Sequence, residues 1–571
     1  MKLRKRYLAI ALAIACVIVA IKCIDNFTDT RAVANESTRA KNCEDWNSIM
    51  ADQANASQIL LGVDGTENTL ANDRLYMDEN FNPMIDIRLL TGYFSCAVIT
   101  NNDTVTLQKF NNEVVLTIGS SEAVVDGLVY ELEAAVTRQD DIVYVPLKSI
   151  GDFLSYDYSW DAANNRIALN NRKPDEKIYP YSYDYRNYQR VPAVKDQAEG
   201  GTCWAFASMT ALESALRPGS TLDFAEDHMV NKNGYNLSES DGGEYNIAMA
   251  YLASWTGPVN EADDPYGDGS SPEGLTAVMH VQEMQIIDSK ALDEIKKYVF
   301  LYGGVQSSLY MSVRDEQGAS TENYSPETSA YCYIGTEKPN HDIVIVGWDD
   351  AYSADNFTTE VSGDGAFICV NSWGSEFGED GFFYVSYYDS NIGIHNICYT
   401  RIDSADNYDN LYQTDLCGWV GQMGYGREYA YFANVYEAES DEELKAVGFY
   451  STGANTSYEV YFVDGYEAMD SFQDKTLVAS GTLSKAGYYT IDVDDGYVLL
   501  KGQRYAVVVY VNTEGSVHPV AIEYASDEYT STVDTTDGEG YISFNGNSWE
   551  HVEETQNCDI CLKMYTDDIK E

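Results

Sequence analysis

One cysteine in the middle of the chain stands where a reactive thiol is expected. Cys203 begins a segment whose apolar residues recur every three or four positions, and Pro218-Gly219 ends that segment. This pattern predicts an amphipathic helix that starts at the cysteine. The positive end of a helix dipole lowers the pKa of a thiol and favours the thiolate. Cys203 could therefore act as a nucleophile if a base lies beside it.

Two residues further along the chain could supply that base and its orienting partner. His341 precedes an apolar run that predicts a buried strand, and Asn371 ends another such run. His341 follows Cys203 by 138 residues, and Asn371 follows His341 by 30. A catalytic cysteine followed about 130 to 150 residues later by a histidine, and then by an asparagine, is the spacing of papain-like peptidases.

The segment from about residue 180 to about residue 400 resembles the papain family of cysteine peptidases. Six blocks carry the resemblance in order: SYDYR, VPAVKDQAEGGTCWAFAS, LDFAEDHMV, DGGEYNIAMAYL, NHDIVIVGWDD and VNSWGSEFGEDGFFYVSY. The resemblance implies a two-lobed α+β domain. In that domain Cys203 would attack the peptide carbonyl, His341 would act as acid and base, and Asn371 would orient the histidine.

The same resemblance implies further site residues. Gln197, six residues before the nucleophile, would donate its side-chain amide to the oxyanion beside the backbone N–H of Cys203. Trp373 would shield the hydrogen bond between the histidine and the asparagine from water. Gly242 and Gly243 correspond to the loop that holds the substrate backbone in extended form, where glycine permits close approach.

Two positions depart from the family pattern. The first cysteine of the usual Cys-Gly-Ser-Cys run is Gly200 here, and Thr202 replaces the serine. The disulfide that normally closes this loop is therefore absent, although the predicted catalytic set is complete. No helical inhibitory propeptide is recognisable before residue 180, because a repeat domain occupies that region.

The flanking sequences predict an export signal and further domains, since 571 residues are too many for one hydrophobic core. Residues 1–34 contain a basic start, an uncharged apolar run and the small residues Ala32-Val33-Ala34, a pattern typical of a cleaved signal peptide. A retained signal-anchor is the alternative. Either way, we expect an exported protein that is extracellular or held at the cell surface.

The region before the peptidase segment divides in two. Residues 35–74 are polar and lack periodicity, which predicts a linker. In residues 75–172, a strand–helix pattern at 84–94 recurs at 144–154. This part resembles the copper amine oxidase N-terminal-like repeat domain. No histidine occurs before His228, so we expect no copper site there. A wall-contacting module and a simple spacer both stay open.

The region after the peptidase segment is predicted to be all-β. We assign residues 173–405 to the peptidase domain, and residues 406–566 contain short alternating runs rich in Tyr, Val, Thr and Gly, which predict a β-sandwich. The order of these runs resembles the lectin-like domain that follows some papain-type peptidases, which implies a cell-wall or glycan partner. We expect residues 173–405 to cleave short peptides without the flanking domains.

Composition argues against several other classes. Lys plus Arg number 36 and Asp plus Glu number 91, giving a formal charge of −55, which disfavours a nucleic-acid partner. Eleven thinly spread cysteines do not indicate a disulfide framework. Cys558 and Cys561 are the only close pair and have no histidine cluster nearby. We therefore expect neither a metal nor a cofactor.

The predicted fold class is α+β, with a two-lobed papain-like peptidase flanked by a small α+β repeat domain and a C-terminal β-sandwich. The predicted function is that of an exported cysteine endopeptidase. A surface adhesin with an inactive peptidase unit is the rival, and the intact set Cys203, His341, Asn371 and Gln197 argues against it. A transglutaminase-like acyl transferase would use an aspartate as third member, so Asn371 argues against that class as well.

Overall fold

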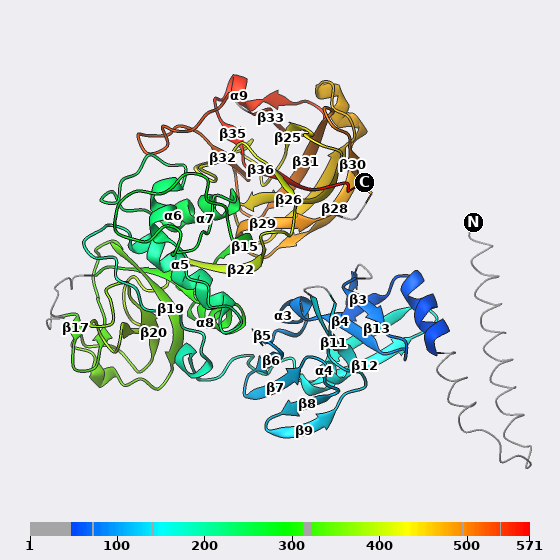
Figure 1. The fold of residues 1–571 in the computed structure, drawn as a ribbon. Helices are drawn as coiled ribbons and strands as arrows, with labels where there is room; N and C mark the ends of the chain where they lie inside the picture. Colours follow the sequence, from blue (N-terminus) through cyan, green and yellow to red (C-terminus); the bar gives the residue numbers. More distant parts are fainter. Residues whose placement is uncertain are drawn as a thin grey trace, which may run out of the picture. The chain divides into compact units, whose positions relative to one another are not determined.

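The structure is a computed structural model that describes residues 47–70, 73–139, 142–311, 322–493, 496–536 and 538–570. The predicted signal peptide lies outside these ranges. The chain divides into two compact units, Met1–Ile178 and Tyr179–Glu571, and Figure 1 colours the chain from blue to red along the sequence. Within the described ranges, no helix is both long enough and apolar enough to cross a membrane.

The first unit is built on the repeat seen in the sequence. β4 (Pro83–Asp86) leads through a single 3-10 turn into α3 (Leu90–Phe94), and β11 (Ile142–Pro146) leads into α4 (Leu147–Phe153). β4 and β11 pair antiparallel, with Ile85 opposite Val145, and both side chains are fully buried. The two copies therefore share one core. Further strands of the unit are β3 (Leu75–Met77), β5 (Ala97–Asn101), β6 (Thr104–Lys109), β7 (Asn112–Thr117), β8 (Glu122–Val125), β9 (Leu128–Glu131), β10 (Thr137–Gln139) and β12 (Tyr156–Asp161).

The segment expected to be a linker, residues 35–74, has regular structure in its described part. Residues 47–56 are helical, and β1 (Leu60–Val63) lies between β2 (Thr66–Thr69) and β13 (Arg166–Asn171). Residues of the helix and of β1 belong to the hydrophobic core of the unit. The linker prediction is wrong here, because a strand of four residues is too short to produce a periodic pattern.

The predicted peptidase segment has two lobes. One lobe contains α5 (Cys203–Leu216), α6 (Glu226–Lys232) and α7 (Tyr245–Ala253). The other is an antiparallel sheet in the order β21-β20-β19-β16-β22-β15, with α8 (Leu292–Leu301) against β16 and β19. Its strands are β15 (Met279–Ile286), β16 (Val305–Leu309), β19 (His341–Asp349), β20 (Ala366–Val370), β21 (Phe382–Ser386) and β22 (Asn396–Ser404).

The C-terminal region is a β-sandwich, as predicted. One sheet has the order β28-β27-β31-β25-β33-β34, and the facing sheet contains β29, β26, β36 and β23. Apolar side chains from both sheets form one core. The strands are β23 (Asn410–Tyr412), β25 (Tyr429–Glu437), β26 (Glu442–Ser451), β27 (Thr456–Val463), β28 (Thr476–Leu483), β29 (Ala486–Asp492), β31 (Arg504–Thr513), β33 (Gly540–Ser543), β34 (Glu550–His551) and β36 (Leu562–Asp568).

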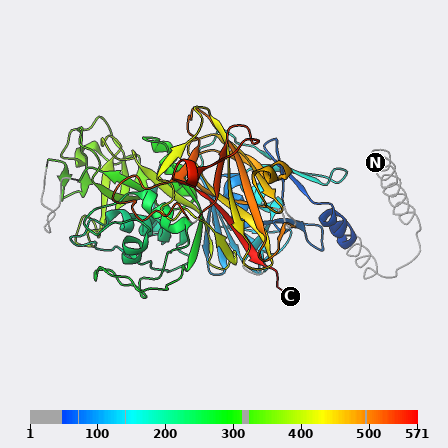
Figure 2. The ribbon, with the colours of Figure 1, turned by 90° about the horizontal axis from the view of Figure 1, so that it is seen from above.

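The peptidase and the sandwich share one continuous sheet. β15 pairs with β22 of the peptidase on one side and with β29 of the sandwich on the other. Figures 1 and 2 both show the yellow-to-red strands lying beside the green segment. Lys485, just before β29, bonds to Asp288 at 2.7 Å and to Glu294 at 2.8 Å. The two predicted domains are therefore joined by backbone pairing as well as by ion pairs.

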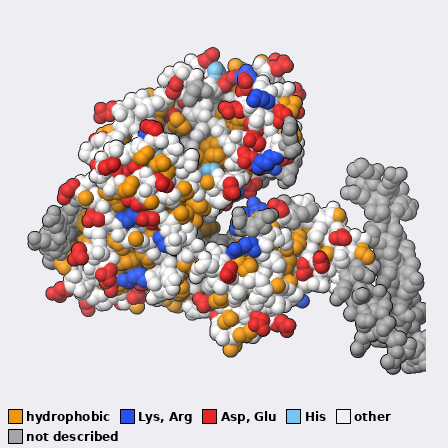
Figure 3. Space-filling view, viewed as in Figure 1, with side chains coloured by type: hydrophobic (Ala, Val, Ile, Leu, Met, Phe, Trp, Pro, Cys, Tyr) orange, Lys and Arg blue, Asp and Glu red, His pale blue; other side chains and the backbone are white. Residues whose placement is uncertain are grey.

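Acidic side chains are spread over one face of the molecule. On the face seen in Figure 3, red Asp and Glu side chains outnumber the blue Lys and Arg side chains, which are scattered. This distribution fits the formal charge of −55. Like charges spread in this way favour solubility over binding to a polyanion.

Candidate active site

Cys203 is the first residue of α5 and is partly exposed. The backbone N–H of Asp342, the residue after His341, reaches the Cys203 thiol, so the packing of α5 on β19 brings these segments together. Burial and the Asp342 carboxylate raise the pKa of the thiol to about 12. The backbone N–H groups of Cys203 and Trp204 at the start of α5 lower this pKa, but burial has the larger effect, so the net shift is opposite to the one expected from the helix start.

His341 and Asn371 are held together by the pairing of β19 with β20. Val344 lies opposite Val370, so the start of β19 and the residue after β20 meet at one edge of the sheet. His341 Nε2 and Asn371 Oδ1 are 2.7 Å apart. The ring centroid of Trp373 lies 4.8 Å from that of His341. The predicted base and its orienting residue are thus hydrogen-bonded beside an indole ring.

Gln197 lies in the loop before α5 and is 4% exposed. Its backbone N–H donates to Ser372 O at 2.8 Å, and its side-chain Oε1 accepts from Ser372 Oγ at 2.5 Å. One amide hydrogen on Nε2 is donated to Gly200 O at 2.7 Å. An amide nitrogen carries two hydrogens, so the second is the one that could reach an oxyanion.

The loop with Gly242 and Gly243 packs beside the start of α5. Gly242 has a φ of +78°, in the left-handed region that favours glycine, and a Cβ on Gly243 would lie 2.5 Å from the ring of Trp204. Gly201 N donates to Glu239 O at 2.8 Å. The packing of Gly243 against the ring of Trp204 therefore requires glycine at position 243, whether or not a substrate binds there.

Three family models match the chain, in the order expected from the sequence. Residues 63–169 match the copper amine oxidase N-terminal domain, residues 179–402 the papain family cysteine protease, and residues 411–566 the lectin like domain. The middle match spans all of the site residues described above. Residues 179–402 are a papain-family cysteine peptidase domain. Domains of this family are cysteine-type hydrolases.

Two solved structures are similar to this chain over 68% of its length. The clostridial cysteine protease Cwp84 after propeptide cleavage has a TM-score of 0.61 and 26% identity, covering 68% of this chain and 99% of that one. The cysteine protease and lectin-like domains of Cwp84 from Clostridium difficile, described as a surface layer associated protein, give a TM-score of 0.59 and 26% identity, covering 68% and 89%.

Curated relatives are similar to a smaller part of the chain. The viral cathepsin of Spodoptera exigua nuclear polyhedrosis virus is 27% identical over 217 residues, or 37% of this chain and 58% of that protein. Pro-cathepsin H of Mus musculus is 31% identical over 217 residues, or 36% and 60%. The chain thus spans about three fifths of the length of these curated relatives.

In this papain-family domain the loop that lacks the usual disulfide is held by hydrogen bonds of Tyr266. Tyr266 Oη donates to Gln197 O at 3.0 Å and is 2.8 Å from Thr202 Oγ1. A Cβ on Gly200 would lie 2.8 Å from the same phenol oxygen. Tyr266 therefore ties the Gln197 loop to the residue before Cys203. The eight cysteines of the described residues are free thiols.

Three residues that contact the site are absent from the sequence prediction. Ser372 and Tyr266 hold Gln197, and Asp342 contacts Cys203. Tyr266 carries no local signal, because only the fold brings it near. Asp342 carries one, since a carboxylate within the apolar run of β19 is unusual for a buried strand.

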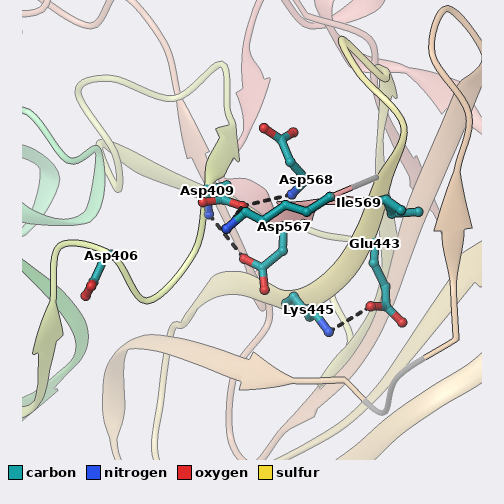
Figure 4. A pocket seen from close by; sticks show the side chains of 8 residues that line it. Asp406, Asp409, Glu443, Lys445, Asp567, Asp568 and Ile569 are labelled. Atoms are coloured by element: carbon teal, nitrogen blue, oxygen red, sulfur yellow. Dashed lines mark hydrogen bonds and ion pairs between the residues drawn. The ribbon is translucent and has the colours of Figure 1, made fainter. Parts of the chain in front are cut away.

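A hollow of about 370 Å³ lies away from this site, at the edge of the sandwich, and is lined mainly by charged residues (Figure 4). Lys445 pairs with Glu443 at 2.9 Å, and Asp409 Oδ2 accepts from the backbone N–H of Asp568 at 3.0 Å. In the described part of the chain, no group of three or more His, Cys, Asp or Glu residues is placed to hold a metal ion.

Proposed function

We propose that the chain is an exported cysteine endopeptidase that hydrolyses peptide bonds in proteins or peptides. The observation that carries the proposal is the 2.7 Å contact between His341 Nε2 and Asn371 Oδ1. In the same domain, the backbone N–H of Asp342, the residue after His341, contacts the Cys203 thiol. Because Asn371 engages Nε2, Nδ1 is the ring nitrogen that exchanges a proton with Cys203.

In the proposed reaction, the Cys203 sulfur attacks the carbonyl carbon while its proton moves to His341. The backbone N–H of Cys203 and the second amide N–H of Gln197 stabilise the oxyanion. The C–N bond then breaks, and His341 gives its proton to the leaving amine, which leaves a thioester on the sulfur. Water, deprotonated by His341, hydrolyses the thioester to a carboxylic acid and restores the thiol.

Location and partners are part of the same proposal. The similarity to Cwp84, described as a surface layer associated protein, supports an extracellular or surface location. The lectin like match of residues 411–566 supports a glycan or cell-wall partner for the sandwich. The chain spans only part of the curated relatives, so peptide hydrolysis by the whole chain is a proposal that the following experiment tests.

Labelling with an epoxide-type cysteine-peptidase inactivator tests the function directly. We expect one label per chain on Cys203 and complete loss of peptide hydrolysis, with Cys203→Ala as the matched control that takes up no label. A partly exposed first residue of a helix contributes little packing, so the Tm of Cys203→Ala should stay close to that of the wild type. A label on another residue, or activity of the variant within about tenfold of the wild type, would contradict the proposal. Complete inertness would favour an adhesin.

A further inference from the structure

Asp342 is a buried carboxylate next to the proposed nucleophile. It follows His341 in β19 and is 9% exposed. Ser308 Oγ donates to its Oδ1 at 2.7 Å, and Gln306 Nε2 donates to its Oδ2 at 2.9 Å. Both donors are neutral, and no Lys or Arg within the described ranges forms an ion pair with Asp342. A buried carboxylate held only by neutral donors gains most from a cation.

Residues from both lobes surround this carboxylate. Its charge acts on Cys203 and Tyr245 of the helical lobe and on Tyr399 of the β lobe. Tyr245 begins α7, and its ring centroid lies 6.5 Å from that of His395, which precedes β22. Asp342 therefore lies at the junction of the two lobes, where a bound peptide would pass the thiol.

Two other titratable groups act on Asp342. His395, which is exposed, and Glu244, also exposed, have opposite effects on the carboxylate. Among the ion pairs of the described residues, none joins His395 to Asp342. Burial raises the pKa of Asp342, and the two neutral donors lower it. The Asp342 carboxyl is thus the buried titratable group of the junction, while His395 and Glu244 are exposed.

We propose that Asp342 determines specificity by accepting a Lys or Arg side chain from the second substrate residue before the scissile bond. The proposal rests on the proposed peptidase function. The loop of Gly242 and Gly243 is the expected binding place of the substrate backbone, and Tyr245 follows directly. A side chain leaving the backbone at that point enters the junction between Tyr245 and Asp342, where an ammonium or guanidinium pairs with the carboxylate.

The pairing has a consequence for the nucleophile. The Asp342 carboxylate raises the pKa of the Cys203 thiol, and a substrate cation beside the carboxylate would offset that field. A basic substrate would then favour the thiolate that attacks it. The preference for a basic substrate residue would appear in kcat as well as in KM, because the substrate cation also acts on the reacting sulfur of Cys203.

Two fluorogenic dipeptides that differ in one residue test the proposal on the full chain. Benzyloxycarbonyl-Arg-Arg and benzyloxycarbonyl-Leu-Arg aminomethylcoumarin share the residue before the scissile bond and differ at the second. We expect kcat/KM to be at least about tenfold higher for Arg-Arg. An equal or higher value for Leu-Arg would overturn the proposal without any variant, while epoxide labelling of Cys203 shows that the peptidase function itself stands.

Asp342→Asn assigns the selection to this residue. We expect the Arg-Arg to Leu-Arg ratio to fall at least about tenfold, and alkylation of Cys203 by iodoacetamide at neutral pH to become faster. Glu244→Gln, which removes an exposed carboxylate nearby, is the matched control and should change the ratio less than about twofold. Equal effects of both variants would mean that a general acidic field selects the substrate and would overturn the role of Asp342. If Asp342→Asn does not fold, the ratio of kcat/KM for Arg-Arg to that for Leu-Arg, measured on the wild type, tests the proposal.

Discussion

Ser372 and Gln197 are hydrogen-bonded through both their side chains and their backbones. Ser372 Oγ donates to Gln197 Oε1 at 2.5 Å, and Gln197 N donates to Ser372 O at 2.8 Å. Ser372 directly follows Asn371, which contacts His341 Nε2. The segment Asn371-Ser372 therefore orients the proposed base His341 and also fixes the proposed oxyanion donor Gln197.

Gln197→Ala should lower kcat by roughly 10² to 10³ with little change in KM, because it removes one oxyanion donor and leaves the nucleophile and base in place. Stoichiometric alkylation of Cys203 should survive the substitution. Steady-state kinetics and a labelling assay measure the two effects. If alkylation is lost, Gln197 positions the thiol instead of the oxyanion.

Ser372→Ala should lower kcat by about three- to tenfold, because Gln197 keeps its amide but loses the hydroxyl that fixes its orientation. Ser372→Thr keeps the hydroxyl and should restore most of the rate. In a double-mutant cycle, adding Ser372→Ala to Gln197→Ala should cause almost no further loss. Additive losses would show that Ser372 acts independently of Gln197.

Asn371→Ala should lower kcat by about tenfold to a hundredfold, because His341 loses the acceptor that fixes its ring. Asn371→Asp retains an acceptor oxygen and is the matched comparison. We expect Asp to preserve more of the rate than Ala, with both variants still labelled at Cys203. A rate for Asn371→Ala within about twofold of the wild type would contradict the orienting role.

The fragment of residues 173–405 was expected from the sequence to act alone, and the shared sheet changes that expectation. Removing the sandwich leaves the edge of β15 unpaired where β29 pairs with it, and exposed strand edges favour aggregation. We expect the fragment to melt at least about 10 °C below the full chain, a loss of several kcal/mol.

The matched control for that truncation is the fragment of residues 173–571, which keeps the sandwich and removes residues 1–172, nearly all of the first unit. It should fold and cleave a short peptide with kcat/KM within about tenfold of the full chain. Circular dichroism melts and peptide cleavage measure both fragments. A 173–405 fragment as stable as 173–571 would show that the pairing of β15 with β29 contributes little.

Glu523, on β32 (Val520–Glu523), makes stability depend on pH. It accepts from the backbone N–H groups of Cys417 and Gly418, and burial, together with the Asp415 carboxylate, raises its pKa to about 8. A carboxyl whose pKa is raised on folding contributes stability that is present below its unfolded pKa of about 4.5 and is lost as pH rises through about 8.

Glu523→Gln should therefore reduce the loss of Tm between pH 5 and pH 9, because its amide stays neutral. A difference of about 1 kcal/mol corresponds to roughly 2–4 °C for a domain of this size. Glu528→Gln, at an exposed position nearby, should melt like the wild type at both pH values. Identical pH profiles for all three proteins would mean that Glu523 is ionised in the fold.

The sequence by itself determined the parts that depend on local pattern and on order along the chain. The helix at Cys203, the strands at His341 and before Asn371, and the repeat of strand and helix at 84–94 and 144–154 all follow from apolar spacing. Each needs only neighbours within about ten residues. The same pattern could not reveal a strand as short as β1.

Only the tertiary structure decided which distant groups meet. Tyr266 closes the Gln197 loop, β15 pairs with a strand about two hundred residues further along, and no local pattern encodes either contact. The Cys203 thiol shows the physical reason most clearly. A helix dipole can be predicted from the sequence, but desolvation and the charge of Asp342 depend on what folds around the sulfur, and these reverse the direction of its pKa shift.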